Sequence, residues 1–161
     1  MTEEFSKPNF NLENIIDQKI FDKNRNFHGV KGLVFIGDKI LTYRRDTKTK
    51  SFPLYIDLPG GGKEEGESPF DTFKRETKEE FGIEINPDDV KYAKQYMSAM
   101  DTTKESYFIV VNPLNMKESD VVFGDEGLEP VLITPDEYLK LNDAIKRQQD
   151  KVVDYLATFK E

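Results

Sequence analysis

Three glutamates in the middle of the chain have the types and spacing that metal chemistry needs. Glu76, Glu79 and Glu80 stand at positions i, i+3 and i+4, a spacing that places their carboxylates on one side of one helix. Like charges at this spacing repel each other by roughly a few tenths of a kcal/mol per pair. A cation between them reverses the sign of that interaction, and carboxylate oxygens are ligands that Mg²⁺ accepts. The cluster therefore predicts a site for a hard divalent metal.

The helix that carries these acids can be bounded from the sequence. Ser68 suits the N-cap, Pro69 the first helical position, and Asp71 the acidic position of a capping box. Gly82 is placed to end the helix in a left-handed conformation. A mostly apolar stripe at steps of three and four is formed by Phe70, Phe73, Thr77 and Phe81. We therefore expect a helix over residues 69–81 that packs on a core with one face and presents its acids on the next.

The acids belong to a longer pattern that resembles the Nudix box, G-x5-E-x7-R-E-U-x-E-E-x-G-U, in which U is a bulky aliphatic residue. All fixed positions are filled, by Gly61, Glu67, Arg75, Glu76, Glu79, Glu80 and Gly82. Ile83 fills the second U position, whereas Thr77 stands at the first, where it buries less apolar surface. At average residue frequencies a chance match is below about 10⁻⁷ per starting point. A merely solvated acidic helix face is therefore a poor explanation.

The resemblance implies an α/β (α+β) fold with a Nudix-like mixed β-sheet sandwiched between α-helices. The order of elements agrees with it, since β-prone runs lie at 30–36, 40–43, 52–58, 90–100, 106–111 and 131–133. Helix-start chemistry returns at 134–137, before an apolar stripe typical of one or two C-terminal helices. The glycines at 60–62 are expected to form a flexible loop whose backbone passes close to a ligand.

Two parts of the chain are distinguished by composition and pattern. Residues 28–161 are expected to form a single Nudix hydrolase domain, and residues 1–27 an N-terminal extension packed on or near it. The extension is polar, with a hint of a short amphipathic helix from Leu12, Ile15, Ile16 and Ile20. A domain of this length can bury a substantial core.

The resemblance also implies roles for the residues of the box. Glu76 and Glu80 are the expected metal ligands, and Glu79 is either a further ligand or the base that activates water. Arg75 is expected to orient a box glutamate through a charge-assisted hydrogen bond. Glu67 either supports the metal site indirectly or pairs with Arg75. The expected metal is Mg²⁺, with Mn²⁺ as a substitute.

Candidate residues outside the acidic helix complete the predicted site. Glu126 lies in an acidic turn flanked by glycines, and in some family members an acid on a late loop binds the metal or acts as the base; an ordinary acidic turn is the alternative. Arg44 and Arg45 follow a predicted strand and are candidates for binding phosphate, although such residues also serve as solvated surface. Gly60 and Gly61 are expected to shape the substrate-binding loop.

Composition excludes several other classes of protein. The chain of 161 residues carries a net charge of −8, which argues against a general nucleic-acid binder. No apolar run approaches 18 residues, and the first residues lack a basic and apolar signal region. Cysteine is absent and His28 is the one histidine, which excludes thiolate and multi-histidine metal sites. These features fit a cytoplasmic protein that acts on a small nucleotide without a membrane, with a homodimer as one option.

The substrate is predicted by elimination. The resemblance implies hydrolysis of a diphosphate linkage in a nucleoside diphosphate joined to another group. The downstream sequence tags of NADH, dinucleoside polyphosphate and ADP-ribose enzymes are missing, and so is an upstream coenzyme A signature. Met100 and Asp101, for example, stand where a tyrosine is expected in dinucleoside polyphosphate enzymes. The leading substrate class is therefore a nucleoside or deoxynucleoside triphosphate, oxidised or not, that gives monophosphate and pyrophosphate. The alternatives are a pyrophosphatase for ADP-ribose or another nucleotide sugar, a non-catalytic nucleotide-binding Nudix module, and an acidic interaction domain.

Overall fold

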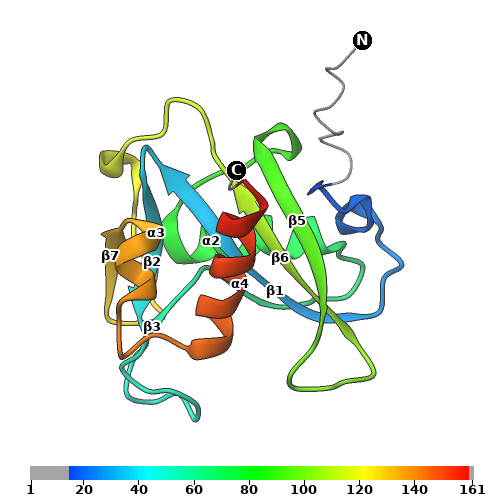
Figure 1. Cartoon of the computed structure of the whole chain (residues 1–161), viewed down its shortest axis with the longest axis horizontal. Helices are drawn as coiled ribbons and strands as arrows, with labels where there is room; N and C mark the ends of the chain where they lie inside the picture. Colours follow the sequence, from blue (N-terminus) through cyan, green and yellow to red (C-terminus); the bar gives the residue numbers. More distant parts are fainter. Residues whose placement is uncertain (1–14, 160–161) are drawn as a thin grey trace.

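Helices cover both faces of a mixed seven-stranded sheet in the computed structural model, which describes residues 15–159 (Figure 1). The elements follow one another in the order η2 (Gln18–Phe21), β1 (Phe27–Ile36), β2 (Lys39–Arg44), β3 (Ile56–Asp57), β4 (Gly60–Gly62), α2 (Pro69–Phe81), η3 (Pro87–Asp89), β5 (Val90–Met97), β6 (Glu105–Val111), η4 (Glu118–Asp120), β7 (Glu129–Ile133), α3 (Pro135–Leu139) and α4 (Lys146–Thr158). The predicted fold class, a mixed sheet between helices, is confirmed. None of the described helices is long and apolar enough to cross a membrane.

Strand β1 holds the sheet together because it pairs with three other strands. The strand order is β3-β2-β1-β6-β5, with β4 paired to β1 and β7 paired to β2. The end of β1 turns back into β2 at Gly37, as the predicted hairpin requires, while most of its length runs parallel to β6. Its start runs antiparallel to β4, the segment that leads into α2. Strand β1 therefore fixes the position of the segment where the box begins.

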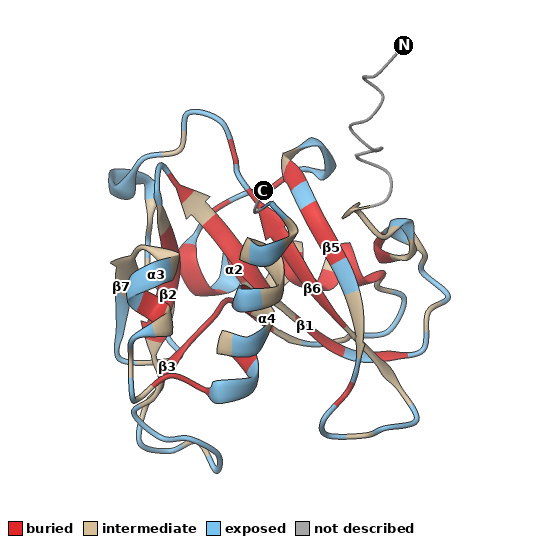
Figure 2. Cartoon of the chain, viewed as in Figure 1, coloured by how far each residue is buried: buried red, intermediate tan, exposed pale blue. Residues whose placement is uncertain are grey.

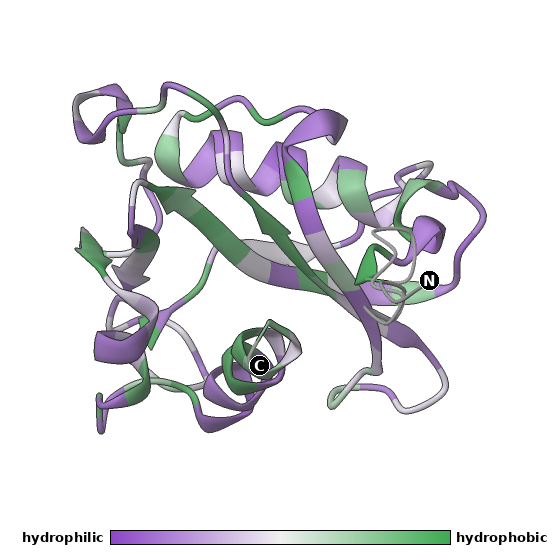
Figure 3. Cartoon of the chain, turned by 45° about the horizontal axis from the view of Figure 1, so that its top comes forward, coloured by the Kyte–Doolittle hydropathy of each residue, from purple (hydrophilic) through white to green (hydrophobic). Residues whose placement is uncertain are grey.

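The sheet separates two hydrophobic cores, as the alternation of side chains along its strands requires. On β6, Tyr107, Ile109 and Val111 pack toward α2, whereas Phe108 and Val110 pack toward α3 and α4. Figure 2 shows the buried strands between the helices, and Figure 3 shows α2 and α4 on opposite sides of the sheet. Because each core packs on the same central strands, both helices are held at fixed positions relative to the sheet.

Helix α2 begins and ends as its sequence predicts. The Ser68 side chain accepts a hydrogen bond from the Asp71 amide at 3.1 Å, and the Asp71 carboxylate accepts one from the Ser68 amide at 3.0 Å. Gly82 ends the helix with φ +69°, which a residue with a Cβ adopts only at a cost. Thr77 is fully buried, and its hydroxyl has no hydrogen-bond partner within residues 15–159.

Two expectations about the segment before α2 were wrong. A strand was expected over 52–58, but only β3 forms there, because Phe52 and Leu54 have positive φ values of 51° and 67° on either side of Pro53. The glycines at 60–62 form β4 instead of a flexible loop. A Cβ at Gly60 would overlap the Val30 carbonyl oxygen, so glycine is required there by the close approach of β1. After α2, the strand expected at residues 90–100 ends earlier, at Met97, the last residue of β5.

The described part of the N-terminal segment lies against the sheet. Ile20, in the single turn η2, is fully buried in the core on the α2 side. Ile16 forms an isolated parallel bridge with Ala93 of β5. Leu12, which belongs to the predicted amphipathic helix, lies outside the described residues.

Candidate active site

The predicted acids of α2 and of residues 121–128, the late loop between η4 and β7, line one cavity. Its volume is about 280 Å³, and the carboxylates around it are those of Glu76, Glu79, Glu80, Asp125 and Glu126. The first three come from consecutive turns of α2, and the last two come from the segment before β7. The structure therefore brings together all four residues expected to bind metal, although 46 positions separate Glu80 from Glu126.

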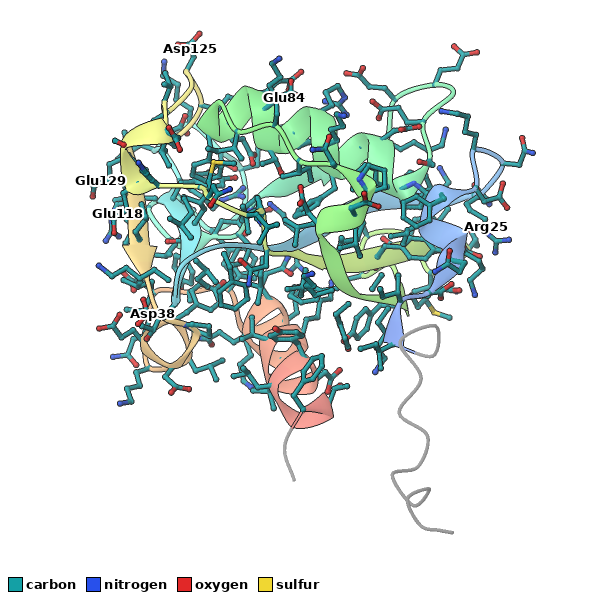
Figure 4. The ribbon with its side chains drawn as sticks, turned by 90° about the horizontal axis from the view of Figure 1, so that it is seen from above. Arg25, Asp38, Glu84, Glu118, Asp125 and Glu129 are labelled. Carbon is teal, nitrogen blue, oxygen red and sulfur yellow. The ribbon has the colours of Figure 1, made fainter. Side chains whose placement is uncertain are left out.

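The late loop is attached to the end of α2 by backbone hydrogen bonds. The amides of Val122 and Gly124 donate to the carbonyls of Phe81 and Glu80 at 2.8 and 2.9 Å. These carbonyls belong to the last turn of the helix, where no intrahelical donor is available. Phe123, between the two amides, packs its ring against Phe81 with centroids 6.0 Å apart. Figure 4 shows the neighbouring Asp125 beyond the end of α2.

Glu80 is the most buried of the candidate ligands, with 7% of its surface exposed. The Gly60 amide donates to its Oε1 atom at 3.1 Å, so β4 holds one of its two oxygens. Burial raises the pKa of Glu80 to about 8; Lys31 opposes the rise and Glu76 adds to it. A buried carboxylate that resists ionisation gains most from a bound cation, because the cation favours its charged form.

Arg75 connects the box acids through a network of hydrogen bonds. Its Nε atom donates to Glu67 at 2.7 Å, and its Nη1 atom donates to Glu76 at 3.0 Å and to Glu79 at 3.4 Å. Its Nη2 atom donates to the Gly62 carbonyl at 2.9 Å. Partial burial would raise the pKa of Glu67, but hydrogen bonds from Arg75, the Glu64 amide and Thr72 together lower it. Of the two arrangements considered for Glu67, the structure shows the pairing with Arg75.

The carboxylates are gathered but do not yet form a coordination sphere. Within residues 15–159, no group of three His, Cys, Asp or Glu side chains lies close enough to hold a metal ion in these conformations. Glu76 and Glu79 are directed toward Arg75, and Glu126 is exposed. The donor set still fits Mg²⁺ or Mn²⁺, since every donor is a carboxylate oxygen. Convergence on a metal requires rotation of these side chains, with the backbone already in place.

The two arginines proposed to bind phosphate point to different sides. Arg45 donates from Nη1 to the Asp57 Oδ2 atom at 2.7 Å and lines the cavity that also includes Gly61. Arg44 donates to the Leu54 carbonyl at 2.8 Å and to Asp143 at 3.1 Å. Because neighbouring residues at the end of β2 face opposite ways, Arg45 lies beside the box and Arg44 holds the segment before α4.

Two residues beside the site were missed by the sequence analysis. Lys31 of β1 donates to the fully buried Asp57 at 3.0 Å, and to the carbonyls of Leu58 at 3.0 Å and Gly60 at 3.4 Å. Burial would lower the pKa of Lys31, but the charges of Asp57, Tyr43 and Glu80 together outweigh it, so the pKa is raised. The sequence does contain a signal for this pair, because Lys31 and Asp57 are each a charged residue inside an apolar run. The pair fixes the β4 segment next to Glu80.

The comparison with known families agrees with this geometry. A family model described as NUDIX domain matches residues 27–156 of the chain. The chain belongs to the Nudix family. With all fixed residues of the Nudix box in place, family membership makes the chain a pyrophosphohydrolase. No curated protein matches the chain at an accepted level of significance.

Solved structures share the Nudix fold at low sequence identity. The MutT protein from Methanosarcina mazei Go1 is 21% identical with a TM-score of 0.67, and the match covers 86% of this chain and 99% of that one. An Ap4A hydrolase from C. elegans is 16% identical with a TM-score of 0.58, over 80% of this chain and 96% of that one. A bifunctional NMN adenylyltransferase/ADP ribose pyrophosphatase from Francisella tularensis, in complex with AMP and a Mn ion, is 19% identical with a TM-score of 0.58; the match covers 82% of this chain and 41% of that one. At these low sequence identities, the matches show that this chain shares the fold of those proteins.

Proposed function

We propose that this Nudix protein hydrolyses a diphosphate linkage in a nucleoside diphosphate joined to another group, with Mg²⁺ bound by carboxylates of α2 and of the loop before β7. The observation that carries the proposal is the cavity in which Glu76, Glu79, Glu80 and Glu126 meet. Such a cluster is costly without a cation, because Glu80 is buried and its pKa is raised. Mn²⁺ is expected to substitute, since it accepts the same oxygen donors.

The chain's own residues divide the work of this reaction between them. When bound, the metal stabilises negative charge on the phosphate oxygens and lowers the pKa of a water molecule. Glu79 and Glu126 are the candidates to accept the proton of the attacking water. Arg75 holds Glu76 and Glu79 in position, and Arg45 lies where it can neutralise phosphate charge.

For the substrate, we propose a nucleoside or deoxynucleoside triphosphate, oxidised or not, that yields a monophosphate and pyrophosphate. The support is the absence of the sequence tags that mark other specificities. The alternatives are ADP-ribose or another nucleotide sugar, because one structural neighbour is an ADP ribose pyrophosphatase. A non-catalytic nucleotide-binding module predicts binding without turnover. A cytoplasmic location is part of the proposal and rests on the lack of cysteine.

A product analysis in ¹⁸O-labelled water tests the proposal. The protein is incubated with Mg²⁺ and a panel of triphosphates, oxidised deoxynucleotides, ADP-ribose, NADH and diadenosine polyphosphates. We expect metal-dependent cleavage, with the label in one of the two products identifying the phosphorus that water attacks. Glu80→Gln should abolish turnover, whereas Glu84→Gln should not, because Glu84 pairs with Lys78 away from the cavity. Nucleotide binding without turnover of any substrate would contradict the proposal.

A further inference from the structure

A second cavity adjoins the box on the α4 side of the sheet. It has a volume of about 400 Å³ and runs from Gly61 and Gly62 to Arg147 and Lys151 on α4; we call it the α4 cleft. Figure 3 shows α4 across the sheet from α2. Because the cleft includes Gly61, which lies against the Glu76 carboxylate, a substrate whose diphosphate lies at the box can extend into it.

The α4 cleft carries positive charge in a chain that is strongly negative. Lys31, Arg45, Arg147 and Lys151 line it, and no aspartate or glutamate is among its described lining residues. The Asp57 carboxylate is shared by Lys31 and Arg45, which both contact its Oδ2 atom. The described lining therefore carries four cationic groups and no carboxylate, whereas the whole chain has a net charge of −8.

Arg147 and Lys151 are the cations of the cleft without an acidic partner. Neither forms a salt bridge with any residue in the range 15–159; each lies over an aromatic ring instead. The Arg147 guanidinium carbon is 5.7 Å from the centre of the Phe52 ring, and the Lys151 Nζ atom is 5.1 Å from that of Tyr96. Such rings hold a cation in place without neutralising it.

This arrangement is unfavourable in the free protein. Arg147 and Lys151 are four residues apart on one helix, where like charges repel. Burial, together with the charges of Arg147 and Lys31, lowers the pKa of Lys151 to about 8. An anion placed between the two side chains would remove the repulsion and compensate for the lost hydration.

We propose that Arg147 and Lys151 in the α4 cleft hold a phosphate monoester on the ribose of the substrate. The proposal rests on the proposed function and narrows the class of substrate. The preferred substrate then carries a phosphate on its ribose in addition to the diphosphate that is cut. The cleft fits such a group, since an arginine provides paired donors and a lysine provides a compact charge for phosphate. The same cleft includes Tyr96, Met97 and Met100, which offer apolar contacts for a base.

Binding of three nucleotides to the whole protein tests this inference without turnover. The probes are AMP, adenosine 2′,5′-bisphosphate and adenosine 3′,5′-bisphosphate, which differ by one phosphate monoester. Isothermal titration at pH 7 should show that at least one bisphosphate binds roughly 10-fold or more tightly than AMP, as charge-assisted hydrogen bonds imply. Equal affinity for all three nucleotides would overturn the inference.

Substitutions on α4 and β5 show whether the named residues cause the preference. Arg147→Gln and Lys151→Gln should each remove most of the preference for the bisphosphate and leave the affinity for AMP nearly unchanged. Lys94→Gln is the matched control, because Lys94 also lies 5.1 Å from the Tyr96 ring but pairs with Asp154 and does not line the cleft. A loss of equal size in Lys94→Gln, or a preference that survives in both α4 variants, would overturn the assignment.

The outcome is separable from that of the proposed function. A bisphosphate preference that depends on Lys151, together with no hydrolysis of any nucleotide, would support the cleft assignment and contradict the enzymatic proposal. Metal-dependent hydrolysis with equal affinity for AMP and the bisphosphates would support the enzymatic proposal and contradict the cleft assignment.

Discussion

Replacing Glu80 by glutamine should make the metal-free protein more stable at alkaline pH. The pKa of Glu80 is raised by burial to about 8 from an ordinary value of 4.5. Because the folded-state pKa is the higher one, the protonated carboxyl contributes stability below pH 4.5, and this contribution is lost as the pH rises toward 8. Glutamine keeps an oxygen that accepts the Gly60 amide and never ionises.

The size of the effect follows from the two pKa values. At about 1.4 kcal/mol for each tenfold change in proton affinity, the wild-type protein should lose roughly 3 kcal/mol between pH 5 and pH 8 that Glu80→Gln does not lose. For a domain of this length, that corresponds to a difference of roughly 6–12 °C in melting temperature. Glu76 is present in both proteins and Lys31 stays charged in both, because its pKa is raised, so the difference between the two isolates Glu80.

Urea unfolding with a chelator at pH 5 and pH 8 measures this difference. Glu79→Gln is the control, because the Glu79 side chain is 59% exposed and its variant should follow the wild-type protein. Mg²⁺ at pH 8 should then raise the melting temperature of the wild-type protein, but hardly that of Glu80→Gln, since a ligand that binds only the folded state stabilises it. Identical pH dependence in wild-type and Glu80→Gln would refute the reasoning, because it would mean that Glu80 is solvated.

Four further substitutions test other parts of the site. Gly82→Ala should cost about 1 kcal/mol in urea unfolding, because φ is +69° there; a neutral result would mean that the helix end relaxes. Gly61→Ala should weaken Mn²⁺ binding in a calorimetric titration with little loss of stability, because its Cβ would overlap a flexible box carboxylate. Thr77→Val should raise the free energy of unfolding by about 1 kcal/mol, since it removes a buried hydroxyl without a described partner; a loss would show that the hydroxyl is bonded. Glu126→Gln should lower kcat by roughly 10²-fold with little change in KM, whereas Asp125→Asn should not; equal small losses would indicate a general field effect.

Local signals carried the prediction of α2 and failed for the segment before it. The ends of α2 are fixed by interactions between neighbouring residues, so Ser68, Asp71 and Gly82 identified them. The structure of 52–62 is fixed by contacts with distant strands. Gly60 is needed because β1 passes close by, and Phe52 and Leu54 have left-handed backbone conformations that their residue types disfavour. No local pattern reports such contacts.

The site shows the same division between local and distant information. Helical spacing alone placed Glu76, Glu79 and Glu80 together, and the family pattern suggested the loop acid Glu126. The opposite directions of Arg44 and Arg45 depend on how β2 pairs with β3 and β7, which composition does not reveal. The cations of α4 were overlooked because they are far from the box in sequence and meet it only across the sheet.

The two backbone hydrogen bonds from the late loop to the end of α2 also affect how the metal site assembles. They close a chain segment of some forty residues in the folded protein, from Phe81 to Val122. The entropy of bringing the loop acid to the helix acids is therefore part of folding, and metal binding has only to order side chains. Hydrogen exchange at Val122 and Gly124 should consequently be slow before any metal is added, and these amides would report the loop closure directly.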